Sequence, residues 1–125
     1  MRVLTVDDSR AIRIMVRKLC AEAGFEVSEA ENGEVALAAL AAQKHDLVIL
    51  DITMPVLDGP STLEALRRAG DQTAVIMLTS ERQQSIVDRI ESLGVSGYVK
   101  KPFTREELKA AIQKALGVPM PSAAA

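Results

Sequence analysis

The sequence predicts an α/β domain: a parallel β-sheet with helices packed on both of its faces. Two aliphatic runs, residues 47–50 and 74–78, are unbroken by polar residues, which indicates strands buried on both faces. Short apolar runs alternate with segments of helical periodicity along the chain, as in folds built from strand–helix–strand units. Parallel strands need such crossover connections, so the order of the elements also predicts how the strands pair.

Composition and length limit the classes of protein to consider. The chain has 125 residues, 48% hydrophobic and 26% charged, which is typical of one globular domain. Its formal net charge of −2 argues against a protein that mainly binds nucleic-acid phosphates, and no apolar run approaches the roughly twenty residues that cross a bilayer. The N-terminus lacks signal-peptide features, and the single Cys20 excludes an internal disulfide or a cysteine-cluster metal site. We therefore expect a cytoplasmic protein that binds neither membranes nor nucleic acid directly.

The predicted strands are short and apolar, and most predicted helices have an identifiable start or stop. The strands are expected at residues 3–6, 25–30, 47–51, 74–78 and 97–99. The helices are expected within residues 9–24, 32–43, 60–70, 82–93 and 104–116. Ser9 can cap the first helix, Pro60 suits a first helical turn, and Thr104 begins a capping-box pattern. Residues 1–117 then form one domain, and 118–125 are expected to be a flexible tail, whether a natural end, the start of a linker or a remnant of cloning.

Polar side chains follow four of the five predicted strands. Asp7 and Asp8 follow the first strand, Asp51 ends the third, Thr79 follows the fourth and Lys101 follows the fifth. The carboxyl ends of parallel strands lie at one edge of the sheet, where ligands of open α/β sheets bind. We therefore expect an acidic triplet, a hydroxyl and an ammonium group at one rim.

These side-chain types suit phosphoryl chemistry with a divalent cation. Three crowded carboxylates repel one another and raise each other's pKa unless a cation lies between them. Oxygen ligands without His or Cys favour a hard ion, for which Mg²⁺ is the obvious candidate. The metal and Lys101 would balance the charge of a phosphoryl group, and an Asp could act as nucleophile to give an aspartyl phosphate. Simpler interpretations stay open here: the Asp7-Asp8 pair could only cap the first helix, and Thr79 could be an ordinary strand-end hydroxyl.

Taken in order, the motifs closely resemble the receiver domain of bacterial two-component response regulators. They are Asp7-Asp8, Asp51 followed by Met54-Pro55 and Asp58-Gly59, Thr79-Ser80, and Lys101-Pro102-Phe103. The resemblance covers residues 1 to about 117. It implies a flavodoxin-like, doubly wound sheet of five parallel strands in the order 2-1-3-4-5, with five helices. It also implies a signalling switch rather than an enzyme, one that catalyses only its own phosphoryl transfer and autodephosphorylation.

The resemblance implies a role for each motif residue. Those roles are phosphorylation by a histidine kinase (Asp51), Mg²⁺ binding (Asp7, Asp8, Asp51 and the backbone carbonyl of Thr53), phosphate binding and switching (Lys101, Thr79 and Tyr98), and tuning of the acyl-phosphate lifetime (Thr53 and Glu81). Tyr98 would turn inward when the Thr79 hydroxyl moves toward the phosphoryl group. Lys101 is preferred over Lys100 because it directly precedes Pro102, in a peptide bond that the resemblance implies to be cis.

The resemblance also implies the partners. They are a histidine kinase, a phosphatase and a downstream target such as the flagellar motor, which would read a face formed by the fourth helix, the fifth strand and the fifth helix. The protein would be a monomer or a weak, phosphorylation-dependent dimer. We expect a stand-alone regulator of the chemotaxis type, with the N-terminal receiver of a longer response regulator as the alternative.

Further alternatives depend on one or two residues each. A phosphatase of the haloacid-dehalogenase type also uses a strand-end Asp with Mg²⁺, but it needs a second Asp where this chain has Thr53. A docking module that is never phosphorylated would lack Asp51 or Lys101, and both are present. Tyr98 could be only an aromatic residue at the rim of the core. Cys20 is expected to be a small buried hydrophobic residue, and His45 a loop residue rather than a ligand.

Overall fold

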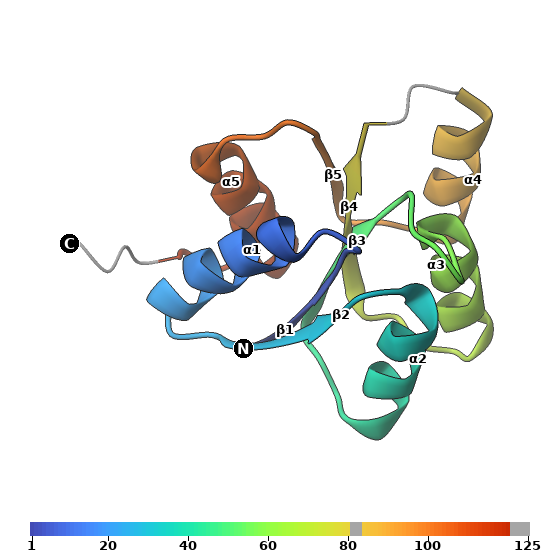
Figure 1. Cartoon of the computed structure of the whole chain (residues 1–125), viewed down its shortest axis with the longest axis horizontal. Helices are drawn as coiled ribbons and strands as arrows, with labels where there is room; N and C mark the ends of the chain where they lie inside the picture. Colours follow the sequence, from blue (N-terminus) through green and yellow to red (C-terminus); the bar gives the residue numbers. More distant parts are fainter. Residues whose placement is uncertain (81–83, 121–125) are drawn as a thin grey trace.

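Five parallel strands form one sheet in the order β2-β1-β3-β4-β5 in the computed structural model, which describes residues 1–80 and 84–120. The strands are β1 (Arg2–Val6), β2 (Glu26–Ala30), β3 (Leu47–Asp51), β4 (Ala74–Thr79) and β5 (Gly97–Lys100). The helices are α1 (Arg10–Glu22), α2 (Gly33–Ala42), α3 (Gly59–Arg68), α4 (Gln84–Leu93) and α5 (Arg105–Leu116). Helices α1 and α5 cover one face of the sheet, and α2, α3 and α4 cover the other (Figure 1). The predicted fold and strand order are confirmed.

The sheet separates two hydrophobic clusters, and the central strand β3 contributes to both. Leu47 and Ile49 pack with α1 and α5, whereas Val48 and Leu50 pack with α2, α3 and α4. Successive side chains of a strand point to opposite faces, and both faces are covered by helices, so β3 has no exposed side. All five of its residues are buried. A polar side chain at the end of β3 therefore lies directly against the core.

Side-chain caps begin four of the helices. The cap residues, each accepting a hydrogen bond from a first-turn N–H at 2.8–3.3 Å, are Ser9, Asn32, Asp58 and Thr104. Each satisfies a backbone donor that the helix itself leaves unpaired, a contribution of about 1 kcal/mol. The α3 cap places Pro60 inside the first helical turn, as expected. The chain thus leaves β1, β2, β3 and β5 through turns that are held by short polar side chains.

The element ends differ slightly from the sequence-based expectations. β2 begins one residue later, at Glu26, while β4 and β5 each run one residue further, to Thr79 and Lys100. Described residues of α4 start at Gln84, and its expected beginning at residue 82 lies outside the described part. Among the described residues, no helix has both the length and the apolar character that a membrane span requires.

The first part of the expected tail is packed rather than free. Met120 is 4% exposed and belongs to the cluster formed with α1 and α5. Its long, unbranched side chain can fill an irregular gap, which the surrounding Pro and Ala residues could not do. Residues 121–125 lie outside the described part of the chain. Cys20 is buried, as expected, and His45 lies in the loop before β3 but is only 4% exposed.

The loop between β3 and α3 contains a strained residue. Val56 has a φ of 70° and is 68% exposed, and the next residue, Leu57, donates its N–H to the Pro55 carbonyl at 2.8 Å. A positive φ costs an L-residue roughly 1–2 kcal/mol, and a β-branched residue tolerates it poorly, whereas Asn is several-fold enriched among the non-glycine residues with a positive φ. We expect Val56→Asn to raise the free energy of unfolding, measured in urea, by about 1 kcal/mol.

The matched control makes the same chemical change in a helix. Val35 is also exposed, at 42%, but lies in α2. Val35→Asn should leave stability unchanged or lower it slightly, since Asn gains nothing in a right-handed helical conformation. If both variants changed stability by the same amount, the backbone of Val56 would not be a source of strain.

Candidate functional site

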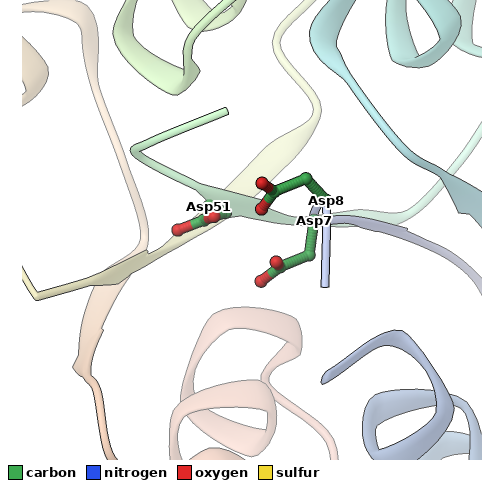
Figure 2. A group of neighbouring side chains, drawn as sticks. All are labelled: Asp7, Asp8 and Asp51. Atoms are coloured by element: carbon green, nitrogen blue, oxygen red, sulfur yellow. The ribbon is translucent and has the colours of Figure 1, made fainter. Parts of the chain in front are cut away.

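Three carboxylates meet at the carboxyl edge of the sheet. One oxygen from each of Asp7, Asp8 and Asp51 lies within 4.8 Å of the other two. Asp7 is fully buried and Asp51 is 5% exposed, whereas Asp8 is exposed. Figure 2 shows Asp7 and Asp8 at the end of β1 and Asp51 next to them at the end of β3. The acidic triplet predicted from the sequence is therefore brought together in space.

Strand pairing explains why these side chains meet. β1 and β3 are neighbouring parallel strands, and Val6 lies opposite Leu50. The next residues, Asp7 and Asp51, therefore lie at the same level of the sheet. The N–H of Asp7 donates to the Ala30 carbonyl at 3.1 Å, which extends the pairing with β2 beyond the strand. Asp51 lies opposite Leu78 of β4. The site is thus fixed by four adjacent strands, β2, β1, β3 and β4.

Lys101 places an ammonium group between two of the carboxylates. Its Nζ lies 3.0 Å from Asp7 Oδ2 and 3.1 Å from Asp51 Oδ1, and its side chain is 23% exposed. The backbone N–H of Lys101 donates to the Thr79 carbonyl at 2.7 Å, just past the end of β5. The Lys101-Pro102 bond is cis, as the resemblance implied. Lys100, by contrast, is exposed at the end of β5.

Burial and like charge both act on Asp51. Desolvation, and then repulsion by Asp7, raise its pKa to about 6, although attraction by Lys101 opposes the shift. For Lys101, burial alone would lower the pKa, but hydrogen bonds and attraction from Asp7 and Asp51 outweigh burial, so the net pKa is raised. At neutral pH the site therefore holds an ionised Asp51 beside a protonated lysine. That is the protonation state a carboxylate nucleophile needs.

The first turn of α3 packs against the backbone of Asp51. Gly59 donates its N–H to the Ile52 carbonyl at 2.8 Å. A Cβ atom at position 59 would lie 2.3 Å from the carbonyl oxygen of Asp51 and 2.8 Å from the Ile52 Cα. Only glycine permits this approach, because every other residue carries a Cβ atom that would clash here. The Asp58-Gly59 motif thus has two parts: Asp58 caps the helix, and Gly59 lets it come close to the carboxylate strand.

The remaining predicted residues lie around the cluster rather than in it. Thr79 ends β4 at 8% exposure, and its register partner on β5 is Lys100. Thr53 is exposed two residues past β3, and Glu81 lies outside the described residues. Tyr98 packs against the cluster formed with α2, α3 and α4. Its hydroxyl is buried and has no hydrogen-bond partner within residues 1–80 and 84–120, and burial, followed by repulsion from Glu91 and Asp88, raises its pKa.

Sequence motifs did not point to one further group near the carboxylates. Arg13, on α1, donates from Nη1 to the backbone carbonyl of Asp7 at 2.6 Å and pairs through Nε with Glu29 of β2 at 3.1 Å. Its place one turn after the Ser9 cap is the only hint in the sequence, since that turn lies next to the end of β1. Nothing in the sequence identifies Glu29 as its partner, because that contact depends on how α1 lies across β2.

The donor set fits a hard divalent cation. Within the described residues, the one group of three or more potential His, Cys, Asp or Glu ligands is this carboxylate triplet, and it contains oxygen donors only. Such donors favour Mg²⁺ over zinc or copper. Asp8, the exposed member, would leave the ion accessible to water and to a phosphoryl group. The geometry therefore suits binding of a metal ion next to a carboxylate nucleophile and a lysine.

Comparison with known proteins agrees with this chemistry. Residues 3–113 match the response regulator receiver domain. The chain is 37% identical over 116 residues to the chemotaxis protein CheY of Bacillus subtilis, covering 92% of this chain and 97% of that protein. It is 38% identical over 117 residues to the response regulator MprA of Mycolicibacterium vanbaalenii, of which it spans only 50%.

Solved structures give the same result. The chain is similar to the chemotaxis response regulator CheY4 of Vibrio cholerae with a TM-score of 0.85 and 36% identity, over 92% of this chain and 98% of that one. It is also similar to a CheY-like receiver domain protein of Methanospirillum hungatei, with a TM-score of 0.88, 26% identity and 93% coverage of both chains. The chain therefore belongs to the response regulator receiver domains, the phosphorylation switches of two-component signalling.

Proposed function

We propose that this chain accepts a phosphoryl group from the phosphohistidine of a histidine kinase onto Asp51, with Mg²⁺ held by Asp7, Asp8, Asp51 and the carbonyl of Thr53. The observation that carries the proposal is the position of Lys101 Nζ, within 3.1 Å of both Asp7 and Asp51 at the end of the central strand. A lysine there stabilises an ionised nucleophile and can then pair with the transferred group. The family of the chain supports the same chemistry.

In the transfer step, a carboxylate oxygen of Asp51 attacks the phosphorus atom, the P–N bond breaks, and its electron pair goes to the imidazole. Mg²⁺ would supply charge neutralisation for the phosphoryl oxygens. Lys101 supplies a second positive charge. The first turn of α3 packs closely on the Asp51 backbone at Gly59 and would limit its movement during the attack. Positioning and charge balance, rather than acid–base chemistry, account for the catalysis of such a step.

The signal would pass from the site to the face formed by α4, β5 and α5. Thr79 would move to bond the phosphoryl group, and Tyr98, on β5, would change its packing in response, which shifts the population between two conformations of that face. Thr53 and Glu81 would tune how long the acyl phosphate lasts. A partner in the cytoplasm reads the altered face, with the protein as a monomer or weak dimer.

We consider two biological settings, each supported by one of the relatives. Coverage of 97% of the Bacillus subtilis chemotaxis protein favours a stand-alone regulator of the chemotaxis type. Coverage of 50% of MprA supports the second setting, the receiver part of a longer response regulator. Membership of the receiver family argues against a haloacid-dehalogenase-type phosphatase, as does Thr53 in the position of the second Asp.

The test is addition of beryllofluoride or acetyl phosphate, with and without Mg²⁺, followed by NMR. The wild type should show Mg²⁺-dependent shifts around Thr79 and Tyr98, and Asp51→Asn should abolish them because it lacks the nucleophile. Asp46→Asn is the matched control: Asp46 is an exposed acid at the other end of β3, where Asn keeps an acceptor for the Arg2 N–H. A wild type without a Mg²⁺-dependent response, or an Asp51→Asn variant that still responds, would overturn the proposal.

A further inference from the structure

We propose that Arg13 is a positioning residue for the carboxylate cluster, and that Glu29 keeps its guanidinium in place. The inference rests on the proposed function, because it concerns the affinity of the same site for a divalent cation. It adds two residues, from α1 and β2, to a site otherwise built from the ends of β1, β3, β4 and β5.

Arg13 connects three parts of the chain through one planar group. Its Nη1 donates to the Asp7 carbonyl at 2.6 Å, while Nε donates to Glu29 Oε1 at 3.1 Å. The other oxygen of Glu29 accepts from Arg17 Nη1 at 2.9 Å. The side chain of Arg13 is 15% exposed, against 60% for Arg17, so the Arg13 contacts lie in the less hydrated and therefore stronger part of the network. A lysine could not make both Arg13 contacts, since it lacks the rigid fork.

The Asp7 carbonyl matters because it belongs to the peptide that leads to Asp8. The side chain of Asp7 is already held, with Oδ1 accepting from the Ser9 N–H at 2.9 Å and Oδ2 contacting Lys101. Asp8 differs: its carboxylate is exposed and makes no hydrogen bond or ion pair within residues 1–80 and 84–120. Its position therefore depends on its backbone. By holding the Asp7 carbonyl, Arg13 holds the peptide between Asp7 and Asp8 and so the position of the Asp8 Cα, from which its side chain extends.

Glu29 has a second effect, which is electrostatic. A guanidinium without its carboxylate partner, so close to Asp7, would compete with a divalent cation for the carboxylate cluster. A hollow of about 340 Å³, lined by Arg13, Glu29, Ala30, Glu31 and Val35, gives the freed side chain room to move. The pair with Glu29 thus holds the arginine against the backbone and away from the carboxylate oxygens.

The alternative is that Arg13 only joins α1 to β2. A pair that only joined a helix to a strand near the surface would contribute about 0–1 kcal/mol to stability and would not alter metal binding. The two interpretations differ in what Arg13→Lys does. A structural role tolerates lysine, whereas a positioning role through the two-contact fork does not.

The experiment measures Mg²⁺ binding by NMR titration and calorimetry for Arg13→Lys, Arg13→Gln, Glu29→Gln and, as the control, Arg17→Gln. Both Arg13 variants should bind Mg²⁺ about 10-fold more weakly, as expected for a lost supporting contact, and should show shifted Asp8 and Ser9 amides without metal. Glu29→Gln keeps an acceptor but leaves the arginine charge unbalanced, so it should also weaken binding. Arg17→Gln should stay within about 2-fold of wild type.

Phosphorylation by acetyl phosphate adds a second readout. Saturating Mg²⁺ should restore the rate of the Arg13 variants to near the wild-type rate, because the lost function is metal binding and not nucleophilic attack. Urea unfolding shows whether each variant is folded. If Arg13→Gln is unstable, the measurements are made on Arg13→Lys alone. Wild-type affinity in Arg13→Lys, or an equal loss in Arg17→Gln, would overturn the inference. A wild type that binds no Mg²⁺ would instead overturn the proposed function.

Discussion

Asp51→Asn is expected to make the metal-free protein more stable at neutral pH, by about 3 kcal/mol. In the folded protein the pKa of Asp51 is raised from 3.8 to about 6, mainly by burial and then by Asp7. Between these values the unfolded chain releases its proton while the folded chain keeps it, so stability falls as pH rises from about 4 to 6. A shift of about two pKa units corresponds to roughly 3 kcal/mol. Asn cannot ionise, so the variant escapes this cost.

Urea unfolding between pH 4 and pH 8 in the presence of a chelator tests the expectation. The difference between the variant and the wild type should be largest above pH 6 and small near pH 4, where Asp51 is protonated in both states. Added Mg²⁺ should stabilise the wild type more than Asp51→Asn, because a ligand that binds only the folded protein shifts the equilibrium toward it. A constant difference across the pH range would show that ionisation of Asp51 is not its cause.

Gly59→Ala is expected to destabilise the protein by about 3 kcal/mol and to impair phosphorylation as well. The new Cβ would lie 2.3 Å from the Asp51 carbonyl oxygen and 3.0 Å from its carbonyl carbon. Both are backbone atoms of a central strand and cannot turn aside as a side-chain tip would, so either α3 or the end of β3 must shift. The gain in helix propensity of roughly 1 kcal/mol does not offset such a clash.

Gly97→Ala is the matched control, because a Cβ at position 97 meets no atom within 4 Å. Its free energy of unfolding should lie within about 1 kcal/mol of the wild type, since surface changes away from packed groups have small effects. The NMR signals of Asp51 and Ile52 should move in Gly59→Ala and stay in place in Gly97→Ala. If the two variants were equally stable, α3 would not be packed as tightly on β3 as the distances indicate.

Features that a local sequence pattern encodes were predictable. Features that depend on the angle or distance between packed helices and strands were not. The both-face burial of β3 follows from four consecutive aliphatic residues, and the Ser9 and Thr104 caps follow from side-chain chemistry at single positions. The meeting of Asp7, Asp8 and Asp51 could be predicted because parallel strands share a carboxyl edge. The hydrophobic pattern locates the ends of strands only approximately, because a polar residue can still pair in the sheet. For this reason β4 and β5 run one residue further than expected.

Other parts of the site could not be reached from the sequence. The Arg13–Glu29 pair depends on the angle at which α1 crosses β2, and no periodicity encodes that angle. The close approach of Gly59 to Asp51 depends on the distance between α3 and β3, although the Asp58-Gly59 pair predicts a turn. Outside the site, the packing of Met120 could not be predicted either, because one methionine in a segment rich in Pro and Ala carries no helical or strand pattern.

The Lys101–Asp7 contact joins residues 94 positions apart, at nearly opposite ends of the folded domain's sequence. A ribosome making this protein releases Asp7, Asp8 and Asp51 long before Lys101 emerges. Until the last strand has docked, the acidic residues are present without the ammonium group that balances them, and no complete site exists. The complete charge arrangement of the site therefore depends on the docking of β5, the last strand of the sheet to be synthesised.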